Sequence, residues 1–406
     1  MSYMDLNAGI TKVQKMNRDM VHTFAAEVLR PASLDLDKLD PEDVIERESI
    51  FWEVFRKGYK IGMHKILLPE IYGGGGFSPL EVHMLFEEIS WGSVDFMIAF
   101  GVACFPAFIA SMVPTEFLIE NIIIPFCEDE EAKIIGCWAI TEPDHGSDTL
   151  GPFTAQFSQP DIAKTACRAT LDGDDYVING TKAAWVSNGT IATSAALFCA
   201  VTDGSDLLGG GIFLVPLELP GVSRGKPLNK IGQRPLNQGE LFFDDVRIPA
   251  IYQVSGPETY DFLVDQVLCL ANAGMGVTFV GLARAALEEA VAYAKERVQG
   301  GLPIIEHQSV KARLFKMFTS VEAARSLARR ASYYNATHEP LVQYSIASKV
   351  FATNTAFEVA SGALQIFGGN GLSREYPIEK MMRDARASMI EDGCNDILSL
   401  VGAEKL

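Results

Sequence analysis

The chain has 406 residues, of which 48% are hydrophobic and 21% are charged, and its formal net charge is −18. This length supports a large buried core, and the composition is that of a globular protein. The strong negative charge argues against a nucleic-acid-binding protein and against docking on an anionic membrane surface.

Residues 1–129 are expected to be helical. Asp40 followed by Pro41 is typical of a helix start, and residues 78–81 (SPLE) form a capping box with proline at the first helical position. The glycine-rich residues 68–74 are expected to form a loop. The uncharged stretch 96–113 is interrupted by a proline and lacks a basic flank, so it predicts a buried helical pair and no integral membrane segment.

Residues 130–249 show a different pattern, with short apolar runs between turn signals. Residues 172–175 (DGDD) and 179–180 (NG) are expected to be hairpin-type turns around a short alternating run, and the glycines at 209–211 are expected to form a turn. Further strands are expected at 197–201, 212–215 and 241–243. Together these predict a small β-sandwich or barrel.

Helical periodicity returns in residues 250–406. Long helices are expected to end near Val298 and to cover 309–335 and 344–366. Gly274 and Gly276 lie inside an apolar helical stretch and predict close helix packing rather than a nucleotide loop. The fold class is therefore α+β, with a helical domain, a β-domain and a helical bundle in that order.

The cysteines and histidines suggest no metal. Seven cysteines lie far apart without paired spacing, and six scattered histidines form no zinc-like cluster. The N-terminus shows neither a secretory signal nor an Arg-rich transit pattern. We therefore expect a reduced, cytoplasmic protein without a metal site.

Several segments, in a fixed order, resemble one family. They read CWAITEPDHGSD at 137–148, WVSNG at 185–189, KIGQR at 230–234 and IEDGCNDI at 390–397. On physical grounds the first is a strand that runs into a polar turn rich in hydrogen-bond donors. Taken together the segments are similar to those of the FAD-dependent acyl-CoA dehydrogenases, and the resemblance covers nearly the whole chain.

The resemblance implies a flavin site and a substrate site. It gives the role of substrate contacts to Ser147, Asn272 and Gly393, and the segment KIGQR a structural role. The residues that it implies as FAD contacts are Trp138, Ile140, Thr141, Gly146, Ser147, Trp185, Ser187, Arg297, Gln299, His307, Gln308, Gln365, Gly368, Gly369 and Asn395.

Part of this set implies an assembly. In the family the counterparts of Arg297, Gln299 and residues 307–308 and 365–369 bind FAD across a subunit boundary, and a guanidinium suits a dianionic pyrophosphate. A homotetramer is the form that the resemblance implies. An acyl-CoA substrate and an electron-transferring flavoprotein are the expected partners.

The catalytic base is the main departure from the family. The family usually has glutamate where this chain has Asp392, whose carboxylate reaches about 1.5 Å less far by one C–C bond. Because a misplacement of about 1 Å can cost roughly 100-fold in rate, either the substrate sits closer or the task has changed. Glu391 is expected to point elsewhere. Asp95 is a second candidate, whose reading as a helix-end or solvent carboxylate stays open.

Four functions remain open from the sequence. The first is dehydrogenation of an acyl-CoA, with a branched or alicyclic acyl group among the candidates. The second is dehydrogenation displaced from the α,β position of a cyclic acyl-CoA, with Asp95 as the base. The others are a flavin oxidase resembling nitroalkane oxidase and a non-catalytic flavin-binding protein. Cys269 and Asn272 replace the Asp and Arg that contact CoA in many family members, which leaves the CoA contacts open.

Overall fold

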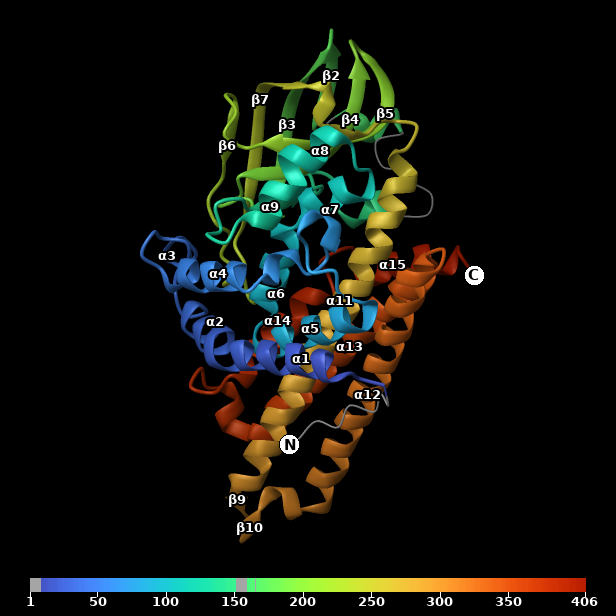
Figure 1. Ribbon diagram of the computed structural model, residues 1–406. Helices are drawn as coiled ribbons and strands as arrows, with labels where there is room; N and C mark the ends of the chain where they lie inside the picture. Colours follow the sequence, from blue (N-terminus) through green and yellow to red (C-terminus); the bar gives the residue numbers. More distant parts are fainter. Residues whose placement is uncertain (1–8, 151–158, 165) are drawn as a thin grey trace.

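The computed structural model describes residues 9–150, 159–164 and 166–406. Residues 1–8 of the expected helical domain, and 151–158 and 165 of the expected β-domain, lie outside this description. Figure 1 shows a sheet at one end of the molecule, short helices around its middle and long helices that run to the opposite tip. The chain is an α+β protein in the order helices, sheet, helices, as the sequence predicts.

The first part of the chain folds into short helices whose starts follow local chemistry. At the start of α5, Glu81 N donates to Ser78 Oγ at 3.4 Å, and Ser78 N donates to Glu81 Oε2 at 3.1 Å. The predicted capping box is therefore confirmed. The helices are α1 (Lys12–Phe24), α2 (Arg30–Leu36), α3 (Pro41–Val44), α4 (Ile50–Lys60), α5 (Pro79–Gly92), α6 (Val94–Ala103), α7 (Phe105–Met112), α8 (Glu116–Leu118) and α9 (Ile124–Glu128).

The uncharged stretch forms the expected buried pair, because α6 and α7 are bent by 49° against each other and most of their side chains are buried. By length and composition, one helix of the described residues, Tyr260–Glu296, is apolar enough to cross a membrane, or two candidates exist if the bent pair counts as one. Most of the apolar window in Tyr260–Glu296 is buried inside the protein, which is the pattern of a core helix.

The middle part forms one mixed sheet of eight strands in the order β6-β7-β3-β2-β4-β5-β8, with β1 parallel to β4. β1 pairs with the first half of β4 and β2 with its second half, both in parallel. The strands are β1 (Gly136–Ala139), β2 (Arg168–Asp172), β3 (Asp175–Ser187), β4 (Ser194–Asp203), β5 (Asp206–Pro216), β6 (Val222–Arg224), β7 (Gln238–Pro249) and β8 (Gln253–Ser255). A short helix, α10 (Pro160–Ala163), precedes β2.

Two expected turns are wrong. The turn at 172–175 joins β2 to β3 as predicted, but Gly180 lies inside β3, at a register shift between β3 and β7. Its φ is +133°, and an added Cβ would lie 2.6 Å from Cys167 Cα, so glycine serves a bulge there. The glycines at 209–211 lie inside β5, where a Cβ on Gly210 would lie 2.4 Å from the Tyr260 ring. Glycine marks close packing at both places rather than chain reversal.

The last part is a bundle around one long helix, α11, which packs against α5, α12 and α13. The predicted close helix packing is confirmed, because a Cβ on Gly276 would lie 2.3 Å from Ser348 Oγ of α13. The elements are α11 (Tyr260–Glu296), β9 (Val298–Gln299), β10 (Leu302–Pro303), α12 (Gln308–Thr337), α13 (Val342–Phe367), α14 (Ile378–Ser388) and α15 (Asn395–Ala403).

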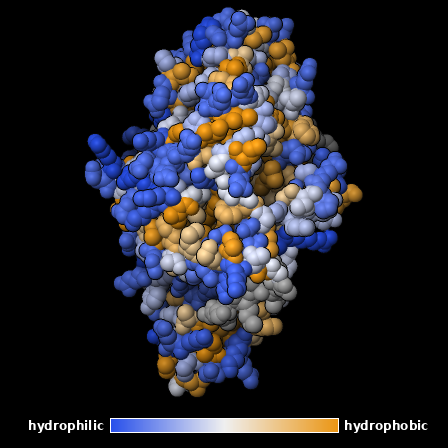
Figure 2. Space-filling model, in the orientation of Figure 1, coloured by the Kyte–Doolittle hydropathy of each residue, from blue (hydrophilic) through white to orange (hydrophobic). Residues whose placement is uncertain are grey.

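Large apolar side chains remain exposed on the C-terminal helices and the turn that follows α13. Phe315 on α12 is 68% exposed, Phe351 on α13 is 42% exposed and Leu372 is 77% exposed. Figure 2 shows that apolar residues also gather across the middle of the molecule and near its lower tip. Contiguous exposed apolar patches mark contact surfaces, so these side chains are candidates for such a surface.

Candidate active site

The end of β1 is held against β3, which brings two of the expected flavin segments together. Ala183 N of β3 donates to Thr141 O at 2.9 Å. Lys182 Nζ, which is fully buried, donates to Ile140 O at 3.1 Å and to Glu142 Oε1 at 2.5 Å. The strand end and the segment that carries Trp185 are therefore neighbours, as the resemblance implies.

The two tryptophans of these segments are placed differently. Trp185 is 58% exposed at the end of β3, although a large aromatic ring gains most from burial. Trp138 stacks on Phe105 with ring centroids 4.6 Å apart, and among the described residues its buried Nε1 has no hydrogen-bond partner. An open aromatic ring and an unpaired buried donor suit a planar, hydrogen-bonding ligand such as the ring system of FAD. Ser187 Oγ, two residues after Trp185, accepts from Gln238 Nε2 at 3.0 Å.

Ser147 connects the flavin segments to the C-terminal turn. It opens a short 3₁₀ helix at Ser147–Leu150, and its Oγ accepts a hydrogen bond from Cys394 N at 2.9 Å. Leu150 Cδ1 lies 3.1 Å from the position of a Cβ on Gly393. Residues about 250 positions apart in the chain thus meet at one place, and the turn with Asp392 lies beside the β-domain.

Asp392 lies in a turn with unusual backbone geometry. Its φ is +53° and that of Gly393 is +88°, so two consecutive residues are left-handed. The side chain is partly buried, and within the described part of the chain it has no hydrogen-bond or ion-pair partner. Burial raises the pKa of Asp392 to about 6, against the opposing charge of Lys349. A carboxylate without donors and with a raised pKa is suited to accept a proton.

Glu391 points away from this position, as expected. Gln233 Nε2 donates to Glu391 Oε1 at 2.7 Å, and Gln233 N donates to Asp384 Oδ1 at 2.5 Å. Burial and the charge of Asp392 raise the pKa of Glu391 to about 7, against the hydrogen bond from Gln233. Gln233 belongs to the KIGQR segment, whose expected role was structural, and it links the β-domain to the turn.

A buried lysine holds the turn from below. Lys349 on α13 is fully buried, and its Nζ donates to Gly393 O at 2.8 Å and to Asn395 Oδ1 at 2.8 Å. The Asn395 amide nitrogen donates to Thr353 Oγ1 at 3.0 Å and to Asn354 Oδ1 at 3.1 Å. Both ends of the Asn395 amide thus contact α13. The expected contact between Asn395 and FAD stays a prediction.

Asp95, the second candidate base, lies in a closed ion-pair cluster. Its Oδ2 accepts from Lys380 Nζ at 2.7 Å, from Ser33 Oγ at 2.6 Å and from Ser93 Oγ at 3.1 Å. The side chain is fully buried. Burial acts to raise the pKa of Asp95, but the Lys380 ammonium and these hydrogen bonds hold that pKa below its usual value. Asp95 is thus neither a solvent carboxylate nor a basic one.

The residues at the usual CoA positions face the bundle interior. Asn272 is fully buried and its Nδ2 donates to Leu268 O at 2.9 Å, while its Oδ1 finds no hydrogen-bond partner among the described residues. Cys269 Sγ lies 3.3 Å from Ser345 Oγ of α13. Asn272 as a substrate contact stays a prediction.

The remaining expected FAD contacts lie far from the sheet. α11 is 37 residues long, so its ends are separated by about 55 Å at 1.5 Å per residue. Its first residue, Tyr260, packs on β5, whereas Arg297 follows its last residue at the opposite tip (Figure 1). There His307 Nε2 lies 2.8 Å from Gln299 O. Arg297, Gln299, Gln308, Gln365, Gly368 and Gly369 are all exposed.

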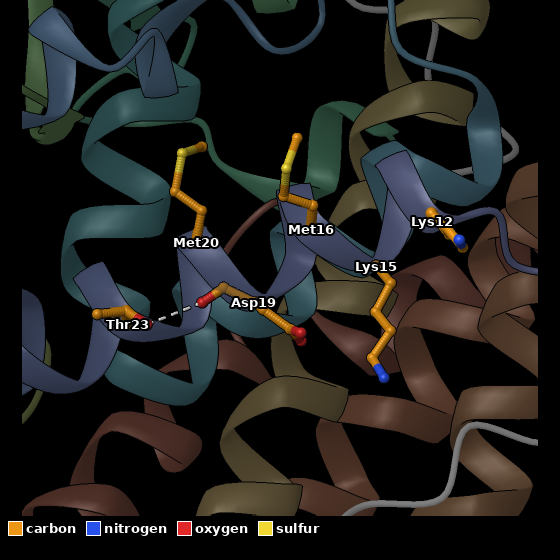
Figure 3. A pocket seen from close by; sticks show the side chains of 6 residues that line it. All are labelled: Lys12, Lys15, Met16, Asp19, Met20 and Thr23. Carbon is orange, nitrogen blue, oxygen red and sulfur yellow. Dashed lines mark hydrogen bonds between the residues drawn. The ribbon is translucent and has the colours of Figure 1, made fainter.

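A surface hollow lies along α1, away from these residues. It is lined by Lys12, Lys15, Met16, Asp19, Met20 and Thr23 (Figure 3). The two methionines project to the same side of the helix, and Thr23 Oγ1 donates to Asp19 O at 3.0 Å. All the lining comes from one helix and includes none of the expected site residues, so we do not assign the active site here.

Family models match each part of the chain. The acyl-CoA dehydrogenase N-terminal domain matches residues 11–112, the acyl-CoA dehydrogenase middle domain matches 137–246, and the acyl-CoA dehydrogenase C-terminal domain matches 266–406.

Relatives and solved structures match over nearly the full length. A probable acyl-CoA dehydrogenase, YngJ, of Bacillus subtilis is 31% identical over 99% of this chain and 100% of its own length. A cyclohex-1-ene-1-carbonyl-CoA dehydrogenase of Geobacter metallireducens is 30% identical over 98% of each. The structure of butyryl-CoA dehydrogenase from Megasphaera elsdenii matches with a TM-score of 0.85 and 28% identity over 99% of each chain. A structure described as the electron transferring flavoprotein of Acidaminococcus fermentans matches with a TM-score of 0.85 and 29% identity over 99% of each chain.

Proposed function

The chain belongs to the acyl-CoA dehydrogenase family, and from that premise we propose that it dehydrogenates an acyl-CoA thioester with Asp392 as the base. Membership makes the protein an FAD-dependent oxidoreductase that acts on CH–CH groups. The observation that carries the proposal is the carboxylate of Asp392, which has no hydrogen-bond partner among the described residues and lies in the turn joined to Ser147.

In the proposed reaction Asp392 takes the α-proton of the acyl group and a C=C bond forms between the α and β carbons. The hydride chemistry would be supplied by FAD when it is bound, as the acceptor for the hydride that leaves the β carbon. Burial of Asp392 favours this role, because a carboxylate that is poorly hydrated binds a proton more readily. The shorter side chain requires the α carbon to lie closer to the turn than it would for glutamate.

The same turn offers donors for the thioester oxygen. The backbone N–H groups of Asp392 and Gly393 donate to no protein group within the described part of the chain. Successive backbone N–H groups in a turn form a concave site that favours an anionic oxygen. Stabilisation of the developing enolate by such donors makes the α-proton more acidic. Gly393 thus supports substrate binding through its backbone.

The test is anaerobic reduction of the flavin by a panel of straight, branched, aromatic-tailed and alicyclic acyl-CoAs. We expect at least one thioester to bleach the flavin of the native enzyme and to bleach that of Asp392→Asn, which retains its FAD, far more slowly. Equal bleaching of the variant would refute Asp392 as the base. Bleaching by a nitroalkane with oxygen consumption, and by no thioester, would favour a flavin oxidase. Bound flavin that no substrate reduces would favour a non-catalytic protein.

The alicyclic arm tests a second candidate. The likeness to the Geobacter relative named for a cyclohexene thioester favours a cyclic acyl group. In that case Asp95 is the alternative base for a proton farther from the thioester. The cluster around Asp95 speaks against this role, because three donors contact one carboxylate oxygen. Loss of alicyclic turnover in Asp95→Asn, with straight-chain turnover intact, would support it.

The partner and the assembly are further parts of the proposal. The likeness to the structure described as an electron transferring flavoprotein supports such a protein as the electron acceptor. Exposed Phe315, Phe351 and Leu372, together with the FAD contacts expected around Arg297, support a homotetramer whose subunits complete one another's flavin sites. All seven cysteines are free, which supports a reducing, cytoplasmic location. Light scattering of the purified protein tests the assembly.

A further inference from the structure

The turn that carries Asp392 is held in a conformation that the chain would not adopt alone. Asp392 is a left-handed non-glycine residue and is followed by a left-handed glycine. Left-handed backbone costs an ordinary residue roughly 1–2 kcal/mol, so it persists only where the surroundings fix it. Two contacts fix the turn from neighbouring elements: Ser147 accepts from Cys394 N, and Lys349 donates to Gly393 O.

Lys349 is an unusual residue for this duty. Lysine is almost never fully buried unless it is paired with an acid, and Lys349 has no exposed surface. Within the described residues its ammonium forms no ion pair within 4 Å, and both of its hydrogen-bond acceptors are neutral, the Gly393 carbonyl and the Asn395 amide oxygen. Burying a charge with neutral partners costs stability. Because the buried ammonium of Lys349 costs stability, we infer that it has a role in function rather than in folding.

The charge of Lys349 acts on the carboxyl groups of the turn. Burial lowers the pKa of Lys349 to about 8, while the charges of Asp392 and Glu391 oppose that change. In return, Lys349 is the charged group that opposes the effect of burial on the pKa of Asp392. Below pH 8 the lysine is mostly protonated, so its positive charge favours the ionised form of Asp392.

Other charged groups near the turn have different partners. Glu391 accepts a hydrogen bond from Gln233. Lys230, which lies in the same loop as Gln233, donates to Leu236 O at 2.7 Å. On the Ser147 side, Asp148 contacts His145 at 3.1 Å and Gly146 N. On α14, Asp384 contacts Lys380 at 2.5 Å. Lys349 differs from these groups because its ammonium donates to the backbone of the turn, at Gly393 O.

We propose that Lys349 is the positioning residue of the Asp392 turn: its ammonium ties Gly393 and Asn395 to α13 and places a positive charge beside the backbone of the proposed base. This inference rests on the proposed function, because it makes Lys349 act through the proposed base. It also explains how a shorter carboxylate is used. With less side-chain reach, the backbone of the turn must be placed more strictly.

The experiment compares three variants of the FAD-loaded enzyme. Lys349→Gln keeps hydrogen-bond donors without the charge, Lys349→Arg keeps the charge in a larger group, and Lys57→Gln on the exposed face of α4 is the control. The rate of flavin reduction by a thioester that reduces the native enzyme is measured against pH. In Lys349→Gln we expect the acid limb to move to higher pH by roughly one unit, the usual size of a neighbouring charge effect. The limiting rate falls, and the apparent Kd for the thioester stays within about twofold because uniform binding is retained.

A second readout does not use the reaction. The infrared band of the protonated Asp392 carboxyl is identified as the band that Asp392→Asn lacks, and it is titrated without substrate. Its midpoint is expected near pH 6 in the native enzyme and roughly one unit higher in Lys349→Gln. This titration remains informative even if no thioester reduces the flavin, so failure of the proposed function and failure of this inference give different results.

Two outcomes would overturn the inference: an unchanged acid limb and an unchanged carboxyl midpoint in a folded Lys349→Gln. If that variant does not fold, Lys349→Arg decides. If the pH profile of flavin reduction in Lys349→Arg keeps the native acid limb but has a lower limiting rate, the inference is supported, because the charge is kept while the turn is displaced. A native limiting rate in Lys349→Arg together with a shifted limb contradicts it.

Discussion

Two carboxylates in this protein, the buried Asp95 and the partly buried Asp392, have opposite surroundings. Asp95 accepts hydrogen bonds from a lysine and two serines on one oxygen, and its pKa lies below the usual value. Asp392 accepts none from the described residues, and its pKa is raised to about 6. Burial acts in the same direction on both, so the donors decide the difference. A buried acid surrounded by donors stabilises the fold, whereas one left without them is available to a substrate.

The largest expected effect separates the two carboxylates by rate. Asp392→Asn removes the proposed base, and general-base catalysis contributes about 10²–10⁴-fold, so flavin reduction is expected to fall by that factor. Stopped-flow absorbance under anaerobic conditions measures it, with flavin content as the control. If Asp392→Asn keeps its FAD and the native rate, Asp392 is not the base, and the contrast between the two carboxylates has no catalytic meaning.

The next effect concerns stability at the other carboxylate. Lys380→Met leaves Asp95 and Asp384 without their shared cation, and breaking a buried ion pair costs about 3–5 kcal/mol. Urea unfolding measures the loss. Lys57→Met, which breaks the exposed pair with Glu53 on α4, is the matched control and should unfold near the native midpoint. Equal midpoints for both variants would mean that the Asp95 cluster contributes nothing to folding.

A milder change at the same site separates stability from catalysis. Asp95→Asn keeps the shape of the side chain but weakens charged hydrogen bonds, which costs about 1–3 kcal/mol for a buried group. Flavin reduction by a straight-chain thioester is expected to stay within a few-fold of the native rate. The opposite result, native stability with a rate as low as that of Asp392→Asn, would exchange the roles of the two residues.

The smallest effect is in the pH dependence of stability. The folded pKa of Asp392 is raised, so the folded state binds the proton more tightly and the free energy of unfolding falls as pH rises from its unfolded pKa to about 6. Asp95 has a lowered pKa, so its contribution is lost only below the usual aspartate range.

Between pH 5 and pH 8, Asp392→Asn is therefore expected to gain roughly 1 kcal/mol over the native enzyme, because one unit of the shift lies above pH 5. The difference between native and Asp95→Asn should stay flat over the same range. Urea unfolding at both pH values measures each difference. If the difference in the free energy of unfolding between Asp392→Asn and the native enzyme is the same at both pH values, the pKa of Asp392 is not raised in the folded protein.

Local signals in the sequence predicted much of the fold. The capping box at Ser78 lies within four residues, and the helical spacing of α11 repeats within one helix, so neither needs distant information. The glycine at 180 was misplaced because a bulge and a turn have the same residue preference, and only the contact with Cys167 tells them apart. The order of the segments, rather than any one of them, predicted the family.

The site was less predictable where the partners are far apart in sequence. The Ser147–Cys394 contact joins residues that share no local pattern, and Lys349 is one lysine within a mostly apolar helix. From the sequence alone, a lysine at that position is expected to extend its ammonium to solvent. It is buried because α15 and the turn pack against it. Gln233 was assigned a structural role for the same reason, since its contact with Glu391 spans two domains.

The length of α11 has one more consequence. Its two ends are about 55 Å apart, so in the proposed assembly a chain that holds one flavin near Ser147 would offer Arg297 to another. In the proposed assembly the activity of one site therefore depends on residues from two chains, so it depends on which variants a cell expresses together. Asp392→Asn and Arg297→Ala, each inactive alone, would restore one of the two sites in every mixed pair when co-expressed, because that site receives both intact residues. For the same reason, a chain with Arg297→Ala would inactivate the flavin site of an intact chain with which it assembles.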